Sequence, residues 1–249
     1  MLGNPCGRAW PYAFASLCAL VSAYAAGLYI ATLGGAVRIG AATPPLAHGL
    51  QSQASAIYLH ALCSAVALMI CGLQMLPAFR RTASVRIHRL LGWAYVCCVA
   101  IGSATGAALS RTATGGAVAT AGFALLAAAW ASTTGAAIYA MRTGRPALHA
   151  RLMSHSAALC FAAVTLRMYL PAAIFAPQIS RGATFEGVYC AIAWLCWIPN
   201  TLAVELYYFW YPGVAHDLPA STTTLPEAAE KLNPSKAIAP DTEHLRGSY

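Results

Sequence analysis

Six long apolar stretches constrain what this chain can fold into more than any other feature. They lie near residues 13–36, 54–78, 86–109, 117–141, 147–174 and 187–210. Each is long enough to cross a hydrocarbon core of about 30 Å, which takes about 20 helical residues. Unpaired backbone groups are costly in lipid, so such stretches are expected to form helices. The sequence therefore predicts an all-α integral membrane bundle of six transmembrane helices.

The charge distribution supports the same class of protein. Hydrophobic residues make up 59% of the 249 residues and charged residues only 9%, which is far from the composition of a soluble domain. Every acidic residue lies at or after Glu186, so the arginines that precede it have no nearby carboxylate in sequence. A basic excess of this kind is typical of loops that face anionic lipid. The expected partner is therefore a lipid bilayer, and nucleic acid is not expected.

The arginines also predict an orientation. Eight of them fall on one side of the predicted helices and three on the other: Arg8, Arg80, Arg81, Arg86, Arg89, Arg142, Arg145 and Arg151 against Arg38, Arg111 and Arg181. The positive-inside rule then predicts cytoplasmic termini in a multi-pass protein of a bacterial inner membrane. We expect a first helix and outer loop at 1–53, a five-helix core at 54–210, and a polar, disordered cytoplasmic tail at 211–249.

Ionisable residues within the predicted spans indicate where function resides, because they are costly in lipid and usually face the bundle interior or a site. The candidates are His60, His88, His149, His155, Arg167 and Glu205. Two of them stand in similar settings. Ser84 is an expected N-cap shortly before His88, and Pro146 suits the first helical turn before His149. We therefore expect these two imidazoles at similar depth near one shared gap.

Helical periodicity gives the faces on which these histidines lie. The face of His88 continues through Gly92 and Tyr95, and the face of His149 continues through Ser156. The small residues on the His88 face, which also include Gly102 and Gly106, leave room for a flat ligand. His155 points about 120° away from His149 at 3.6 residues per turn.

Two neutral imidazoles on facing membrane helices, with arginines nearby, are the ligand set of a bis-histidine haem b. His88 and His149 are the expected iron ligands. Four arginines are positioned for the propionates: Arg86, Arg89, Arg145 and Arg151. The alternative is that both histidines lie at the headgroup interface, where water or lipid phosphate satisfies them.

The other polar residues have open alternatives. His60 is a second ligand, a proton-relay member, a quinone partner or a histidine bonded to a neighbouring helix. Arg167 neutralises an anionic head group or propionate near His60, or extends to the interface. Glu205 receives a proton or pairs with an arginine. A kink and a freed carbonyl are expected at Pro199 and Asn200, and backbone bonds are expected from Thr133 and Thr134.

Several motifs together resemble a known family. They are His88-Arg89-Leu90-Leu91-Gly92 with Tyr95, Thr133-Thr134, His149 with Leu152-Met153, residues 163–167 with Tyr169-Leu170-Pro171, and residues 193–200 with Glu205. They resemble the bacterial membrane-protein family called domain of unknown function 2306, over about residues 54–206. That name implies no activity. A looser similarity to the cytochrome b561 family implies haem-ligating histidines on four helices. The predicted fourth helix has none, which leaves one complete site, His88 with His149.

These observations favour one function and leave two others open. The first is a b-type haem protein that passes electrons between a quinol or other reductant and a redox partner. The second is a small-molecule or proton-coupled transporter, with His60, Arg167 and Glu205 along its path. The third is a membrane-embedded enzyme that uses Glu205 as a general acid on a lipid substrate.

Overall fold

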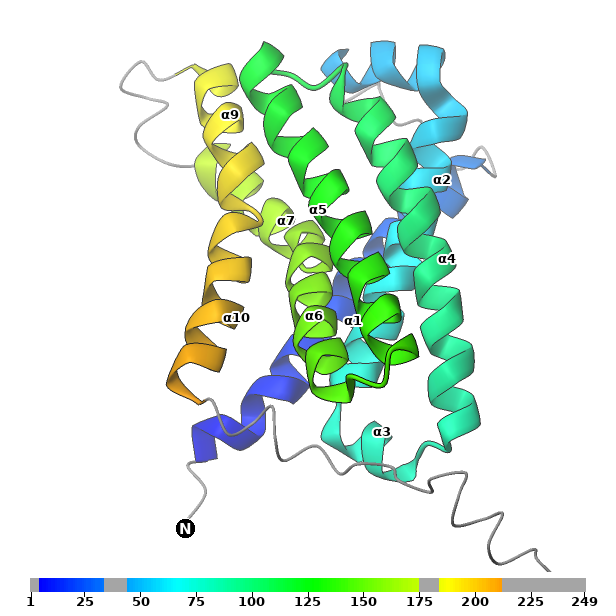
Figure 1. Cartoon of the computed structure of the whole chain (residues 1–249). Coiled ribbons are helices and arrows are strands. Elements are labelled where there is room, and N and C mark those ends of the chain that lie inside the picture. Colours follow the sequence, from blue (N-terminus) through cyan, green and yellow to red (C-terminus); the bar gives the residue numbers. More distant parts are fainter. Residues whose placement is uncertain (1–4, 34–43, 175–183, 212–249) are drawn as a thin grey trace, which may run out of the picture. The chain divides into compact units, whose positions relative to one another are not determined.

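The described part of the chain is entirely helical in its regular elements. The computed structural model describes residues 5–33, 44–174 and 184–211 (Figure 1). Its helices are α1 (Pro5–Leu33), α2 (Pro44–Met75), α3 (Pro77–Thr82), α4 (Val85–Ser110), α5 (Gly116–Arg142), α6 (Pro146–Cys160), α7 (Ala162–Ile174), α9 (Phe185–Leu195) and α10 (Ile198–Trp210). The prediction of an all-α membrane bundle is confirmed. Residues 212–249 lie outside the described residues, so the disordered tail stays a prediction.

Five segments in the described ranges are long and apolar enough to cross a membrane. They are Ala9–Thr32, Gln53–Met75, Val85–Ser110, Gly116–Arg142 and Phe185–Trp210. Each overlaps one predicted stretch. The remaining predicted stretch, 147–174, is present as two shorter helices, α6 and α7, instead of one continuous helix.

The break between α6 and α7 falls at Phe161. The Phe161 amide still donates to the Ala157 carbonyl at 2.9 Å, and the Val164 amide donates to the Phe161 carbonyl at 2.8 Å. The backbone is therefore satisfied although the helix changes direction, as membrane depth requires. The Phe161 ring stacks on Phe14 of α1 with centroids 4.9 Å apart. Sequence reasoning missed this break because no proline or glycine marks it.

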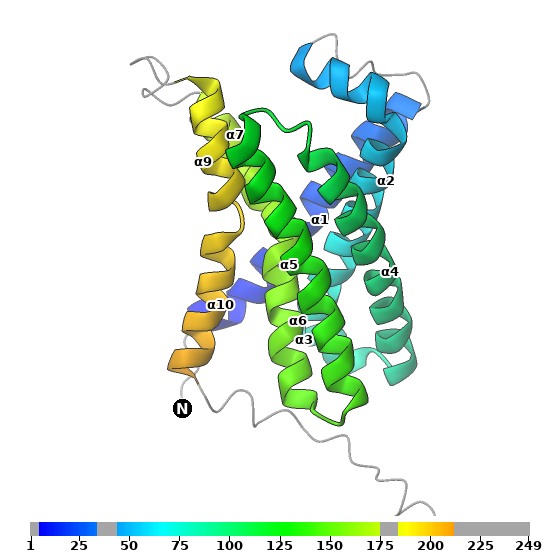
Figure 2. The same ribbon diagram turned by 45° about the horizontal axis from the view of Figure 1, so that its top comes forward.

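A second break separates α9 from α10 at Cys196 and Trp197 (Figure 2). Pro199 lies in the first turn of α10, where its missing N–H costs no helical bond. The kink and freed carbonyl expected near Asn200 are confirmed. Asn200 Nδ2 donates to the Cys196 carbonyl at 2.9 Å, and Thr165 Oγ1 of α7 donates to the same carbonyl.

Small residues set the packing of the bundle. Helix α2 packs along α1 and α4, and α5 packs along α4 and α6, while α9 and α10 pack on α5 and α6 respectively. The core contains Leu68, Val99 and Val164, all 2% exposed or less. Gly102 lets α4 approach its neighbours, since a Cβ there would lie 3.1 Å from Ser64 Oγ and 3.2 Å from the Trp130 ring.

Helix starts follow the expected signals. Ser84 Oγ accepts from the Ile87 amide at 3.4 Å and so caps α4, and α6 begins at Pro146. Gly115, with φ of +96°, forms the turn before α5, where a Cβ would come within 2.6 Å of Cys190 Sγ. Both α4 and α6 therefore begin at one end of the bundle. We call it the basic end, because Arg80, Arg81, Arg86, Arg89, Arg142 and Arg145 lie there.

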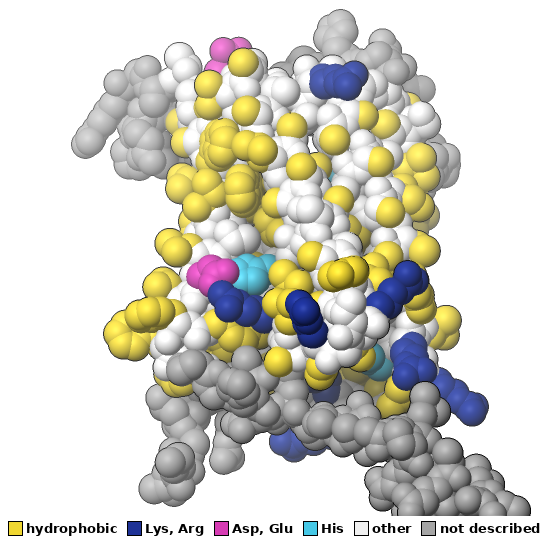
Figure 3. All heavy atoms as spheres, in the orientation of Figure 1, with side chains coloured by type: hydrophobic (Ala, Val, Ile, Leu, Met, Phe, Trp, Pro, Cys, Tyr) yellow, Lys and Arg dark blue, Asp and Glu magenta, His cyan; other side chains and the backbone are white. Residues whose placement is uncertain are grey.

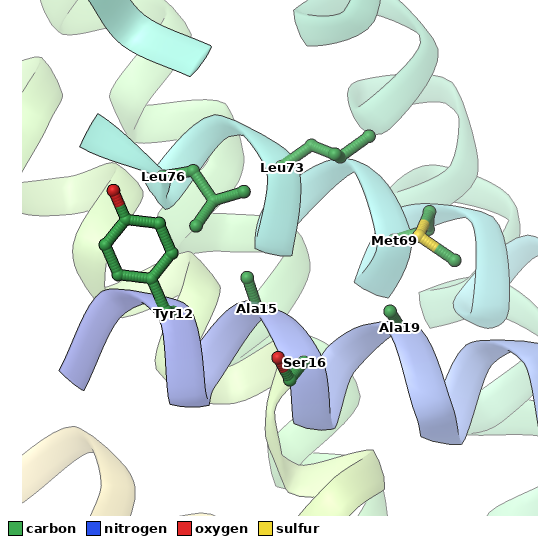
Figure 4. A pocket seen from close by; sticks show the side chains of 7 residues that line it. All are labelled: Tyr12, Ala15, Ser16, Ala19, Met69, Leu73 and Leu76. Atoms are coloured by element: carbon green, nitrogen blue, oxygen red, sulfur yellow. The ribbon is translucent and has the colours of Figure 1, made fainter. Parts of the chain in front are cut away.

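An apolar hollow of about 240 Å³ lies between α1 and α2. Figure 4 shows Tyr12, Ala15, Ser16 and Ala19 of α1 opposite Met69 and Leu73 of α2 and Leu76, which directly follows α2. Its lining contains no charged side chain. The polar side chains that could form a functional site lie elsewhere in the bundle.

Candidate functional site

A buried polar cluster joins α4, α5 and α6. The Tyr95 hydroxyl lies 2.7 Å from Ser156 Oγ, and Ser156 Oγ lies 2.7 Å from Thr134 Oγ1. Trp130 Nε1 donates to the Tyr95 oxygen at 3.1 Å, and Thr134 Oγ1 donates to the Trp130 carbonyl at 2.8 Å. These side chains are 6% exposed or less. Every hydroxyl of the cluster has a partner, as burial in an apolar core demands.

The Tyr95–Ser156 contact brings together the faces that carry two candidate ligands. His88 lies seven residues before Tyr95 on α4, and His149 lies seven residues before Ser156 on α6. Seven residues are close to two helical turns, so each histidine shares the face of its partner in the cluster. Few α4 and α6 residues approach closely, because α4 packs mainly on α2 and less on α5, whereas α6 packs mainly on α5. His88 and His149 therefore lie about two turns from the cluster, toward the basic end.

The two imidazoles differ in their bonding. His149 Nδ1 lies 2.8 Å from the Ala137 carbonyl of α5. A carbonyl only accepts, so Nδ1 carries the proton and Nε2 is left with a free lone pair. His88 is exposed, and its ring nitrogens have no hydrogen-bond partner among the residues that the structure describes. Its charged or titratable neighbours are His149, Arg80 and Arg89.

Open space adjoins His88 on its own helix. Gly92 lies one turn further along α4, and a Cβ placed there would meet no atom within 4 Å. Gly102 and Gly106, further along the same helix, are by contrast closely packed. The Gly92 position near the basic end of α4 is therefore open, whereas the middle of the helix is closely packed.

An ion cluster connects α6 to α10. Arg151 Nη2 lies 2.6 Å from Glu205 Oε2, and His155 Nε2 lies 3.0 Å from Glu205 Oε1. The His155 contact has an ion-pair distance without hydrogen-bond geometry, since Nε2 has no hydrogen-bond partner in the described residues. The Arg151 guanidinium also lies over the Tyr208 ring, 5.6 Å from its centroid. Figure 3 shows magenta, cyan and dark blue side chains adjoining on this face.

This cluster changes the role expected for Arg151. Its side chain is 46% exposed and bound to Glu205, which is 51% exposed, so it is engaged on the α10 side of α6 and not in the gap near His149. Arg80 and Arg89 are the arginines that act on His88. The predicted pairing of Glu205 with an arginine is confirmed.

His60 is fixed between helices α2 and α4. Its Nδ1 lies 2.9 Å from the Gly102 carbonyl. A Cβ at Gly106 would come within 3.0 Å of the His60 ring. Of the alternatives for this residue, a histidine bonded to a neighbouring helix is therefore present. Arg167 of α7 is among its charged neighbours.

The remaining candidates have structural partners. Thr134 bonds backbone as expected, whereas no hydrogen bond of the Thr133 side chain is present in the described residues. Asn200 Nδ2 lies within hydrogen-bond distance of the Ala158 carbonyl and of Thr165 Oγ1, both at 3.3 Å. Sequence reasoning missed Trp130 and Thr165, because their hydrogen-bond partners, Tyr95 and Cys196, are 35 and 31 positions away in sequence. Over the described ranges, no group of three or more histidine, cysteine or acidic side chains is placed to hold a metal ion.

A comparison with protein families decides what kind of chain this is. A family model described as "Predicted membrane protein (DUF2306)" matches residues 57–208, more than half of the chain. The chain belongs to this family. No curated protein and no solved structure matches it. The DUF2306 match includes the Tyr95 cluster, His88, His149 and the Arg151–Glu205–His155 cluster, and it begins after α1, so the apolar hollow lies partly outside it.

Proposed function

We propose that this DUF2306 protein is a b-type haem protein that carries electrons within the membrane, with His88 and His149 as its iron ligands. The observation that carries the proposal is the Tyr95–Ser156 bond of 2.7 Å, because it relates the faces of α4 and α6 on which both histidines lie. Haem supplies a one-electron iron couple when it is bound. The protein would then exchange electrons with a quinol or another reductant and a redox partner.

Three features of the residues near His88 and His149 support haem binding. The Ala137 carbonyl holds the His149 proton on Nδ1, which is how proteins orient a ligating imidazole. The absence of any atom within 4 Å of a Cβ at Gly92 gives space beside His88. Arg80 and Arg89 supply positive charge near His88 for the propionates.

The electron-carrier proposal is tested by an absorption spectrum of the protein purified from haem-replete cells. We expect a Soret band that shifts on reduction with dithionite. His88→Ala and His149→Ala should each abolish it. His155→Ala is the matched control, because it removes a histidine from the same helix as His149 but on the α10 side, and it should keep the band. A colourless wild-type protein, or an unchanged spectrum in both ligand variants, contradicts the proposal.

A second candidate is a proton-coupled or small-molecule transporter, favoured by one specific observation. The breaks α6/α7 and α9/α10 are bonded to each other, since Asn200 and Thr165 both donate to the Cys196 carbonyl. Paired broken helices are characteristic of transporter substrate sites. Glu205 with His155 would then carry the proton. This candidate predicts substrate uptake by proteoliposomes that Glu205→Gln abolishes, together with a colourless protein.

The orientation follows the arginines. We propose that the basic end faces the cytoplasm of a bacterium and that the protein resides in its inner membrane, because arginine-rich loops are retained on that side. Cysteine accessibility in sealed vesicles tests this. A cysteine introduced at Ala83 should react from the cytoplasmic side, and one introduced at Ala113 from the opposite side. The test needs a background in which the native exposed Cys97 is replaced.

A further inference from the structure

Among the residues that the structure describes, no carboxylate forms an ion pair with Arg167. The chain has 7 acidic residues, and the described ranges contain two of them, Glu186 and Glu205. Glu205 is bound to Arg151, toward the basic end. Glu186 is exposed in the first turn of α9, and no salt bridge joins it to Arg167.

The two internal segments outside the described residues add no carboxylate in sequence. Segments 34–43 and 175–183 contain no acidic residue, and the other five acids follow residue 211 in the sequence. A charged side chain within a span is costly. A cation retained at such a cost points to an anion that the described residues do not supply.

The guanidinium of Arg167 is turned toward the middle of the bundle. Helix α7 runs from the break at Phe161 toward the end opposite the basic end. Arg167 Nη1 donates to the Ala163 carbonyl at 2.9 Å, one turn back toward the break. The side chain therefore does not extend to the nearer interface, which was the alternative expected for it.

Among the residues that the structure describes, this guanidinium uses little of its hydrogen-bonding capacity. An arginine has five N–H donors, and the bond to Ala163 is the one it makes within the described residues. Within the described residues, the other N–H donors of Arg167 are available for the bidentate contact that arginine makes with an oxyanion.

Polar groups from two other helices surround this position. Tyr29 and Tyr24 of α1 and His60 of α2 are the titratable neighbours of Arg167. Tyr29 meets Tyr58 edge to face, with centroids 5.8 Å apart. Tyrosine hydroxyls donate hydrogen bonds to oxyanions. We propose that Arg167, with Tyr29 and His60 beside it, binds the carboxylate or phosphate group of an acidic ligand in this half of the bundle.

Two sources supply such a group, an acidic lipid or a small anion from water. The test uses the purified full-length chain in neutral detergent and measures thermal unfolding and binding isotherms. Oleate probes the lipid source, with oleyl alcohol as the neutral control of equal chain length. Butyrate and inorganic phosphate probe the aqueous source. Stabilisation by oleate alone supports the proposal with a lipid ligand, and stabilisation by the small anions supports it with an aqueous one.

Variants assign the effect to the site. Arg167→Gln should weaken binding of the active probe about tenfold or more, which corresponds to about 1.4 kcal/mol, while Arg167→Lys should weaken it less. Arg111→Gln is the matched control, because Arg111 is exposed beyond the end of α4, and should bind as the wild type does.

Three results would overturn the proposal. Oleyl alcohol could stabilise the protein as well as oleate does, with no effect of the small anions, or no oxyanion could stabilise the wild-type protein. The third result is an Arg167→Gln variant that binds the active probe as tightly as the wild type. If Arg167→Gln does not fold, the comparison of oleate with oleyl alcohol and the Arg167→Lys variant decide the question. No readout involves haem, so this result is independent of the electron-carrier proposal.

Discussion

Two histidines of this bundle make the same hydrogen bond in different surroundings. His60 Nδ1 lies 2.9 Å from the Gly102 carbonyl, and His149 Nδ1 lies 2.8 Å from the Ala137 carbonyl. Each bond spans two neighbouring helices and fixes the proton on Nδ1. The His60 ring is packed against Gly106, whereas His149 neighbours His88, whose helix has open space one turn away at Gly92. The bond alone is therefore not evidence of a ligand, and the space next to it decides between packing and binding.

The largest expected change in stability is at Gly102, which is closely packed, in contrast to Gly92, which is open. Gly102→Leu should destabilise the protein by about 1–3 kcal/mol or more, because side-chain atoms beyond Cβ would overlap Ser64 and Trp130. Gly92→Leu should leave the fold intact, since nothing lies within 4 Å of its Cβ. Denaturant or thermal unfolding in detergent measures both.

The Gly92→Leu variant also tests whether the space beside His88 holds a ligand. The side chain introduced by Gly92→Leu would fill the space beside His88, so this variant should fold and lose any bound haem. Gly27→Leu is the control, because its Cβ also meets no atom but lies on α1. Equal destabilisation by Gly92→Leu and Gly102→Leu would show that the gap is not open, and our contrast between the two histidines would fail.

The next largest effect is expected at the polar cluster that joins the two regions. Tyr95→Phe removes the hydroxyl between Ser156 and Trp130 and leaves the buried Trp130 N–H without an acceptor. We expect a loss of about 1–3 kcal/mol. Tyr139→Phe is the control, because Tyr139 is 67% exposed. A Tyr95→Phe protein as stable as the Tyr139→Phe protein would contradict the role of the cluster in holding α4 against α6.

The sequence predicted the elements that hydropathy or a helix-start residue marks, and it missed the break that depends on a tertiary contact. Hydropathy and length were sufficient for five spans, and Ser84 and Pro146 marked the starts of α4 and α6. The break at Phe161 was not predicted, because stacking on Phe14 is a tertiary contact between distant residues. Hydropathy does not record such contacts.

The candidate site was predicted to a similar extent. Helical periodicity placed His88 with Tyr95 and His149 with Ser156 on common faces, and it turned His155 away from His149. It did not reveal that Arg151 binds Glu205 rather than facing the gap, because the two residues are 54 positions apart. The bond between His149 and Ala137 was likewise beyond sequence reasoning, since its acceptor is a backbone carbonyl on another helix.

A smaller effect is expected when the two carbonyl bonds themselves are removed. His60→Phe and His149→Phe keep an aromatic ring of similar size and delete the donor. Each should cost about 0.5–1.5 kcal/mol, the net value of one hydrogen bond. Only His149→Phe should also remove the Soret band. If both variants lose the Soret band, or neither does, open space near a histidine does not decide whether that histidine binds haem.

The smallest effect is expected at the cluster of His155, whose partner is the carboxylate of Glu205 and not a backbone carbonyl. Glu205→Gln breaks the ion pair with Arg151, but both side chains are about half exposed, at 51% and 46%. Such pairs contribute up to about 1 kcal/mol and weaken in salt. A double-mutant cycle with Arg151→Gln, measured at low and high salt, should give a coupling energy within that range. A larger, salt-independent coupling would mean that the cluster is shielded from solvent. The Arg151–Glu205–His155 cluster would then resemble the closely packed surroundings of His60 and not the exposed surroundings of His88.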